Sequence, residues 1–227
     1  MGRLRRTPLH PQWLLARRDP PDWLASSHGV VLDVGAADRW VERHVPHVAR
    51  YVALDYPDTA TAMYRSKPDV FGDGCRLPVS DTCVDSLICL EVMEHVRVPG
   101  ALLDEAERVL IPGGMLWLSV PFMYPIHDAP HDYRRYTEHG LRLLFSERQF
   151  EVLSLRGHGH CIRSAGLVSC LALAGPLQRS MAYKRIPLML LAACLIPLVN
   201  CIAWLLSLAW PTWDAMPMVY EVQARKR

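Results

Sequence analysis

Acidic residues stand where several apolar segments of this sequence end. Asp33 lies inside the apolar segment Val30–Val34, which runs into Gly35 and Ala37, and Asp55 follows the next apolar segment. Small residues let a ligand approach the backbone closely, and a carboxylate at the second position can accept hydrogen bonds from both hydroxyls of a ribose. Asp33 would repel a pyrophosphate, so it suits a cationic or amine-bearing ligand better.

Two further acids follow the next apolar segments. Asp73 stands with Gly74 and Cys75 after Val70–Phe71, and its carboxylate can accept from the exocyclic amine of an adenine. Glu91 directly follows another apolar segment. One acid beside a cation, one at a ribose and one at an adenine together describe S-adenosylmethionine as the ligand.

A sheet is needed to bring these residues together. Buried strands are predicted at Val30–Val34, 51–54, Val70–Phe71, 86–90, 115–120 and 150–155, and helices at 40–48, 100–110 and 138–145. Alternating strands and helices predict a mostly parallel α/β sheet. In such a sheet a ligand binds at the carboxyl ends of the strands, where the acids stand.

Four stretches resemble the successive motifs of class I S-adenosylmethionine-dependent methyltransferases, in the same order and spacing: VLDVGAAD, YVALDYPD, GDGCRLPVSDTCVDSLICLEVMEHV and ALLDEAERVLIPGGMLWLSVP. The resemblance covers about residues 28–155 and is greatest to the small-molecule type with an LPF segment and an E-x-x-EH turn. It implies a Rossmann-like, seven-stranded, mostly parallel sheet with an antiparallel last strand, here residues 218–224. It also implies S-adenosyl-L-methionine as cofactor and in-line displacement at the methyl carbon.

The resemblance gives each cofactor-binding residue a role. Asp33 and Gly35 match the motif that contacts the amino-acid part of the cofactor, Asp55 matches the ribose acid, Asp73, Gly74 and Cys75 match the adenine side, and Glu91 lies beside the sulfonium. Ala37 replaces the second glycine of the usual G-x-G turn, and it is small enough to keep binding, although weakened. The residues alone leave simpler roles open, because Asp33 can cap the turn, Asp55 can cap a following helix and Asp73 can form a turn.

The loop after the fifth predicted strand resembles the P-x-H-x-x-P-x-D-Y-x-R-x-T loop of methyltransferases found beside polysaccharide- and lipid-modifying genes. His127 or His131 could remove a proton from the acceptor, and Arg134 or Arg135 could hold an anionic group of the substrate. Alternatively the loop is a structural lid in which Asp132 pairs with Arg134. The H-x3-H-D spacing could bind a metal, but methyl transfer needs only alignment and, for some acceptors, a base, so no metal is expected.

Charge and cysteine content exclude other classes. The formal net charge of +2 argues against a nucleic-acid binder that relies on bulk positive charge. The seven cysteines are odd in number and include no CxxC pair, which argues against a disulfide framework or a structural zinc site. No apolar segment follows the basic first residues, so a secretory signal is not expected.

The apolar content, 51% hydrophobic overall, is concentrated near the end, where residues 186–213 contain no Asp, Glu, Lys, Arg or His. This stretch is long enough to cross a hydrocarbon layer of ~30 Å. Residues 165–177 are too short to provide a second crossing, and the strands on either side must share one sheet. A membrane-dipping hairpin bent at Pro197 is therefore favoured over a transmembrane segment or a soluble insertion.

We therefore expect a covering segment at 1–27 that contains a short helix near 13–18, a methyltransferase core at 28–160, an apolar helical insertion at 161–213, and a final strand with a basic tail at 214–227. The expected function is methyl transfer to a small-molecule, glycan or lipid-linked acceptor at the inner face of the membrane, with the enzyme cytoplasmic and peripheral or monotopic. The alternative is a membrane-attached scaffold protein that has lost catalysis.

Overall fold

The computed structural model describes residues 7–16, 21–64, 66–178 and 186–227, which form two compact units. The sheet unit consists of the described parts of 21–122, 126–156 and 220–227. The helical unit consists of the described parts of 7–16, 123–125 and 157–219.

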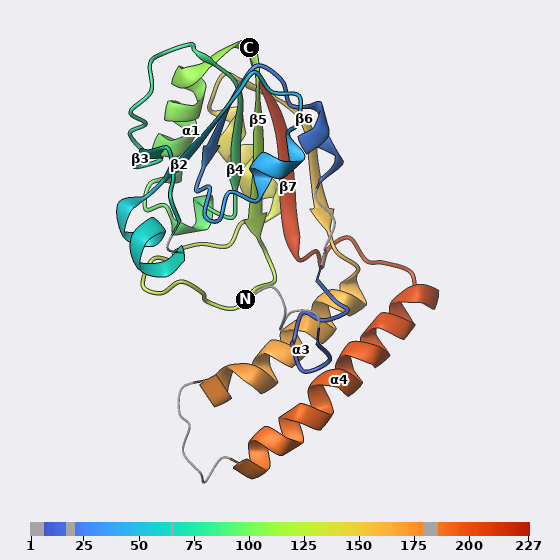
Figure 1. Ribbon diagram of the computed structural model, residues 1–227. Helices are drawn as coiled ribbons and strands as arrows, with labels where there is room; N and C mark the ends of the chain where they lie inside the picture. Colours follow the sequence, from blue (N-terminus) through green and yellow to red (C-terminus); the bar gives the residue numbers. More distant parts are fainter. Residues whose placement is uncertain (1–6, 17–20, 65, 179–185) are drawn as a thin grey trace. The chain divides into compact units, whose positions relative to one another are not determined.

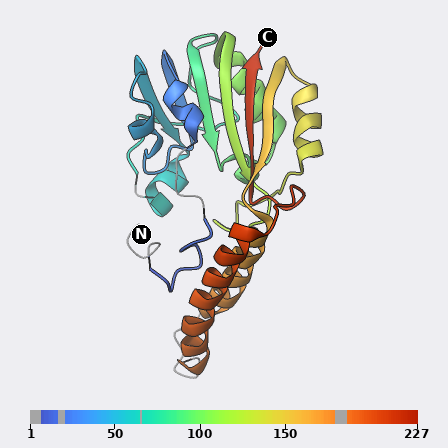
Figure 2. The same cartoon turned by 90° about the vertical axis from the view of Figure 1, so that its right-hand side faces the viewer.

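Seven strands form one sheet in the order β3-β2-β1-β4-β5-β7-β6 (Figure 1). Their bounds are Val30–Val34 (β1), Arg50–Asp55 (β2), Val70–Phe71 (β3), Val84–Leu90 (β4), Leu110–Pro121 (β5), Phe150–His158 (β6) and Val219–Lys226 (β7). Strands β1 to β5 pair in parallel, and β7 runs opposite to its neighbours (Figure 2). The predicted Rossmann-like sheet with an antiparallel last strand is confirmed.

Both faces of the sheet are covered, because neighbouring residues of a strand point to opposite faces. Leu32 and Leu87 lie in the core on the side of α1 (Pro99–Val109) and α2 (Glu138–Ser146). Val31 and Ile88 face the short helices η2 (Asp22–Ser26) and η3 (Val41–His44). The apolar strands therefore have two buried faces, which is why their sequences are nearly continuous hydrophobic runs.

One predicted helix is wrong. Residues 40–48 were expected to be helical, but the structure has only the single turn η3, Val41–His44. Pro46 explains the early end, because proline has no N–H to donate and disfavours helical geometry at the residue before it. Val45 adopts φ −118 and ψ 60, which is outside the helical region.

The helical unit contains an antiparallel pair, α3 (Cys161–Gln178) and α4 (Ile186–Ala209) (Figures 1 and 2). A Cβ added at Gly166 of α3 would come within 2.5 Å of the Ala203 Cβ of α4, so these two small residues allow close approach. The expected bend at Pro197 is wrong, because α4 continues through it. The hairpin consists of the whole of α3 and α4. Among the described residues, α4 alone is long and apolar enough to cross a membrane, and α3 belongs with the shorter apolar helices, as expected for residues 165–177.

The N-terminal segment belongs to the helical unit. The short helix expected near residues 13–18 is wrong for residues 13–16, which form turns, and residues 17 and 18 lie outside the described part. The backbone N–H of Leu14 donates to Oδ1 of the buried Asn200 at 3.1 Å. Leu15 is buried in the core cluster that joins α3 and α4.

Candidate functional site

The turn after β1 has a geometry that restricts which residues it accepts. Gly35 has φ +78, and a Cβ there would come within 2.3 Å of Val92 Cγ2. The N–H groups of Gly35 and Ala36 both donate to the carbonyl of Leu54, at 2.8 and 3.1 Å. Ala37 has φ +44, in the left-handed region that favours glycine. The alanine thus adopts a backbone conformation that glycine adopts without steric strain.

Asp55, at the end of β2, is buried and lies against this turn. Its Oδ2 accepts from the N–H of Ala37 at 3.1 Å, and its Oδ1 accepts from the N–H of Tyr56 at 2.8 Å and the hydroxyl of Thr59 at 3.2 Å. The backbone donors are Ala37 and the adjacent Tyr56, rather than residues two or three positions on as in a helix N-cap, so Asp55 fastens β2 to the turn after β1. A carboxylate has about four acceptor directions, so these bonds leave capacity for a hydroxyl of a ligand.

Asp33 is buried within the sheet unit, 2% exposed, and accepts a hydrogen bond from the hydroxyl of Tyr51. Burial raises the pKa of Asp33 to about 7, against the lowering effect of the Tyr51 hydrogen bond, and the nearby Asp55 charge raises it further. A cation close to Asp33 would oppose this shift and favour the ionised form.

Residues 73–75 make contacts within their own loop and with α1. Asp73 is exposed, and its Oδ1 accepts from the N–H of Cys75 at 2.8 Å, which is the turn-forming role of an aspartate. A Cβ added at Gly74 would lie 3.2 Å from Leu102 Cδ1. The bonds of Asp73 lie within its own turn and those of Asp55 at the end of β2, so their shared role at a nucleoside stays a prediction.

Glu91 begins the loop after β4 and also has a positive φ, +55. Its Oε1 accepts from the hydroxyl of Ser119 at 3.0 Å, and its N–H donates to the carbonyl of the same residue at 3.0 Å. The residue is solvent-exposed, but protein surrounds its carboxyl group, and this loss of hydration, together with the charge of Glu94, raises the pKa of Glu91.

Three side chains meet beyond Glu91, two from the short helix η5 (Met93–His95) and one from the loop after β5. Glu94 has no solvent exposure, and its Oε1 lies 3.5 Å from Nε2 of His95 and 3.7 Å from Nε2 of His127. Neither carboxylate oxygen has a hydrogen-bond partner among the described residues. The two imidazole rings meet edge to face, with centroids 4.8 Å apart. We call these three residues the Glu94 cluster.

Asp132 and Arg135 support His127 from behind. Oδ2 of Asp132 lies 3.2 Å from Nδ1 of His127 and 2.7 Å from a guanidinium nitrogen of Arg135. Burial opposes ionisation of Asp132, but the Arg135 hydrogen bonds lower its pKa to about 2. The pKa of His127 is raised overall. The hydrogen bond with Glu94 raises it most, burial opposes this, and the Asp132 charge adds to the increase. The lid pairing of Asp132 with Arg134 is wrong, because the partner is Arg135.

The other two acceptor-side candidates lie outside this cluster. His131 is exposed, and its Nδ1 lies 3.0 Å from the hydroxyl of Tyr133. Arg134 is exposed and donates to the carbonyl of Val96 at 2.9 Å. Of the residues predicted for the acceptor, the structure brings only His127 against Glu94.

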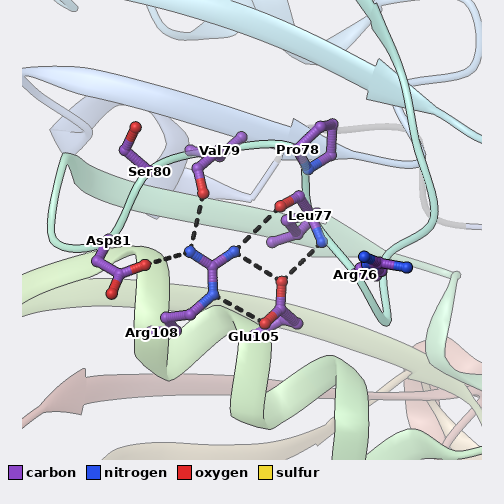
Figure 3. A pocket seen from close by; sticks show the side chains of 8 residues that line it. All are labelled: Arg76, Leu77, Pro78, Val79, Ser80, Asp81, Glu105 and Arg108. Carbon is purple, nitrogen blue, oxygen red and sulfur yellow. Dashed lines mark hydrogen bonds and ion pairs between the residues drawn. The ribbon is translucent and has the colours of Figure 1, made fainter.

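The hollow drawn in Figure 3 lies elsewhere, at the start of β4 rather than at its carboxyl end. The guanidinium of Arg108 fills it, and its donors reach Glu105, Asp81 and the carbonyls of Leu77 and Val79. All five N–H groups of the arginine have partners in this clamp. We assign the hollow a structural role and place the site at the strand ends, where the acids and histidines meet.

Sequence reasoning underestimated four residues of this site: Glu94, His95, Asp132 and Arg135. The E-x-x-EH turn places Glu94 and His95 after the fourth strand, and from the sequence alone they can cap the following loop or touch the substrate. The position of Glu94 and His95 in the chain was the signal for them. They follow one parallel strand, His127 follows the next, and the loops after neighbouring parallel strands lie at the same edge of the sheet. The pairing of Asp132 with Arg135 required the folded loop.

Known proteins show similarity to the same region. Residues 32–118 match the family described as Methyltransferase domain. A protein of Mycolicibacterium smegmatis, named a probable S-adenosylmethionine-dependent methyltransferase, is 33% identical over 96 residues, which are 40% of this chain and 37% of that protein. A protein of the same description from Mycobacterium tuberculosis is 34% identical over 96 residues, 40% of this chain and 35% of that protein. The similarity thus spans little more than a third of each relative.

Solved structures agree in fold. An S-adenosylmethionine-dependent methyltransferase from Mesorhizobium loti has a TM-score of 0.51 at 15% identity, over 86% of this chain and 90% of that chain. The cyclase SpnF has a TM-score of 0.52 at 16% identity, over 90% of this chain and 78% of that chain. Residues 32–118 are a class I S-adenosylmethionine-dependent methyltransferase domain, and S-adenosylmethionine is the cofactor of this class.

Proposed function

We propose that this protein transfers a methyl group from S-adenosylmethionine to an acceptor that lies at a membrane face, in the class of lipid-linked or glycan molecules. The observation that carries the methyl-transfer part is the contact of Asp55 with Ala37, which joins the first two motifs of the domain at the carboxyl edge of the sheet. The membrane part rests on the exposed apolar surface of α4.

The cofactor would lie across the ends of β1, β2 and β4. Its ammonium group suits Asp33, whose ionisation a cation favours, and its ribose suits Asp55. Gly35 leaves the turn after β1 without a side chain, so a ligand can approach the backbone there. Asp73, Gly74 and Cys75 would border the adenine, and Glu91 would lie beside the sulfonium.

The acceptor would approach the Glu94 cluster. His127 is the better candidate for the reacting end, because its ring is held by Asp132 and points toward Glu94, whereas His131 is exposed against Tyr133. An imidazole held in one orientation can receive a proton from an acceptor hydroxyl or amine as the methyl carbon is attacked. Arg134 at the rim would attract an anionic part of the acceptor.

The membrane proposal follows from α4 and from connectivity. By length and composition alone, α4 is able to cross a membrane, and most of its apolar window is not buried in the protein. Since β6 and β7 are neighbours in the sheet and run in opposite directions, the hairpin of α3 and α4 leaves and returns at the same edge. That edge also holds the carboxyl ends of the parallel strands, so the chain connects the hairpin to the sheet at the edge where the cofactor would bind.

Cofactor binding tests the first part. We expect calorimetric titration of the full chain to detect S-adenosylmethionine binding, and Asp55→Asn to weaken it roughly 10- to 100-fold, because hydrogen bonds to a charged group contribute about 1.5–3 kcal/mol. Asp58→Asn, an exposed aspartate of the same loop, is the matched control and should bind as the wild type does. Absence of binding in the wild type would favour the scaffold alternative.

Transfer of a labelled methyl group tests the acceptor. The protein is incubated with methyl-labelled S-adenosylmethionine and either the lipid extract or the aqueous extract of cells that encode it. We expect label in the organic phase of the lipid incubation. Label found only in water-soluble products would refute the lipid-linked acceptor while leaving methyl transfer intact.

A further inference from the structure

The Glu94 cluster brings a buried carboxylate and two imidazole nitrogens close together. Glu94 is fully buried, with two oxygens that have no hydrogen-bond partner among the described residues. A buried ionised carboxylate without compensation costs several kcal/mol. A neighbouring positive charge, either a protonated imidazole of the cluster or a bound cation, offsets that cost.

The partners of the histidines decide which nitrogen carries the proton. Nδ1 of His95 lies 2.8 Å from the carbonyl oxygen of His131, and a carbonyl can only accept, so this nitrogen is the protonated one. Nδ1 of His127 lies 3.2 Å from the Asp132 carboxylate and 3.4 Å from a guanidinium nitrogen of Arg135; the carboxylate is the nearer group, and an N–H at Nδ1 donates to it. In the neutral form of each ring with its proton on Nδ1, Nε2 carries a lone pair, and the two Nε2 atoms lie 3.5 and 3.7 Å from Glu94 Oε1.

We propose that Glu94, His95 and His127 bind a divalent transition-metal ion such as Zn²⁺. The three ligand atoms lie within 4.8 Å of one another, and the two separations from Glu94 Oε1 are 3.5 and 3.7 Å. Bonds of 2.0–2.1 Å in tetrahedral geometry place ligand atoms roughly 3.3–3.5 Å apart. The two distances from Glu94 are thus close to those of a metal site, and the two histidines would move toward each other on binding, from a separation of up to 4.8 Å.

The donor set indicates the class of metal. Two imidazoles and one carboxylate suit zinc and its neighbours, whereas Mg²⁺ and Ca²⁺ prefer oxygen ligands. The surroundings also match a metal site, because Asp132 and the His131 carbonyl hold the far nitrogens of the two rings, as carboxylates and carbonyls hold metal-binding histidines elsewhere. With three protein ligands, a tetrahedral ion keeps one position for an exogenous oxygen or nitrogen.

This inference refines the proposed function at the same edge of the sheet, and it revises the expectation of a metal-free site. With the ion in place, His127 acts as a ligand rather than as the base. The acceptor would bind the fourth position through an oxygen, and the ion would lower the pKa of that hydroxyl. The proton then leaves to solvent as the oxygen attacks the methyl carbon and the carbon–sulfur bond breaks.

Metal titration of the full chain, stripped with chelator, tests the site without an activity assay. We expect one Zn²⁺ to bind per chain, and Co²⁺ to give the intense visible absorption of a four-coordinate ion. Glu94→Gln and His95→Gln should each weaken Zn²⁺ binding roughly 100-fold or more, beyond the effect of removing a group that only supports a ligand. His139→Gln, an exposed histidine on α2, is the control and should bind Zn²⁺ as the wild type does.

Two results would overturn the proposal: no stoichiometric Zn²⁺ in the wild type, or unchanged binding in both variants whose circular dichroism matches the wild type. His127→Gln provides a third position on a different element in case the η5 variants fail to fold. S-adenosylmethionine binding is measured in parallel. Cofactor binding without metal binding refutes the metal site alone, whereas metal binding without cofactor binding refutes the proposed function alone.

Discussion

Ala37 has a backbone conformation that its side chain disfavours. An L-residue in the left-handed region costs roughly 1–2 kcal/mol, whereas glycine costs about 0.5–1 kcal/mol in lost chain entropy. The difference predicts that Ala37→Gly raises the free energy of unfolding by about 0.5–1 kcal/mol. Urea denaturation measures it. Ala36→Gly in the same turn is the control, because Ala36 is not among the residues with positive φ, and it should destabilise. A destabilised Ala37→Gly protein would contradict the argument.

Asp33 should make stability depend on pH. Its carboxyl has a pKa of about 7 in the folded protein and 3.8 in an unfolded chain, so the folded state binds the proton more tightly. The stabilisation from this proton is fully present below about pH 4 and is lost as the pH rises through 7. The free energy of unfolding falls by at most about 4 kcal/mol over this range. Tyr51 and Arg39 oppose the shift and Asp55 adds to it.

Asp33→Asn removes this titration but keeps an acceptor for Tyr51. We expect the stability difference between wild type and variant to change in favour of the variant from pH 4 to pH 7, measured by chemical denaturation at each pH. Equal pH profiles for the two proteins would show that the folded carboxyl ionises normally.

The clamp at Arg108 joins two elements of the fold, because its hydrogen bonds connect residues 77–81 to α1. Arg108→Lys keeps the charge but loses the planar fork that serves several acceptors at once. We expect a loss of about 1–2 kcal/mol in the free energy of unfolding, discounted for the partial exposure of the group. Arg142→Lys is the matched control: its pair with Glu138 is on the surface, so thermal denaturation should show little change.

The predicted helices and strands are confirmed where the apolar pattern of the sequence agrees with the burial of the element in the fold. The strands were predictable because two buried faces demand continuous apolar runs. The helix expected at 40–48 is wrong because Pro46 cannot continue a helix, and only the turn Val41–His44 forms. The hairpin expected at Pro197 failed for the opposite reason: a proline inside a long apolar helix breaks one hydrogen bond, and here the packing of Gly166 against Ala203 accompanies a helix that continues past it.

At the scale of the whole molecule, the apolar surface of α4 is the feature to test. Leu205 and Leu208 are 57% and 62% exposed. Burial of one leucine side chain contributes about 1.5–3 kcal/mol, so replacing both by glutamate should reduce binding to anionic phosphatidylglycerol vesicles more than roughly 100-fold. Flotation of the full chain with such vesicles measures the bound fraction.

Leu143→Glu together with Leu153→Glu is the control, because both leucines are exposed but belong to the sheet unit. These substitutions should leave vesicle binding unchanged. If the wild type stays at the bottom of the gradient, or if both double variants lose binding equally, the membrane face is elsewhere or absent.

The sequence by itself predicted the parallel strands from local apolar runs. Its motifs, through their resemblance to a known family, predicted the antiparallel last strand, the class of domain and the cofactor, because short motifs can be read in order along the chain. Only the tertiary structure decided how the polar residues associate. It paired Asp132 with Arg135, fastened Asp55 to the turn at Ala37, and directed His95 and His127 onto a buried Glu94. Such contacts join residues from separate loops, and their energies depend on burial and on distances of a few ångströms, which spacing along the chain does not specify.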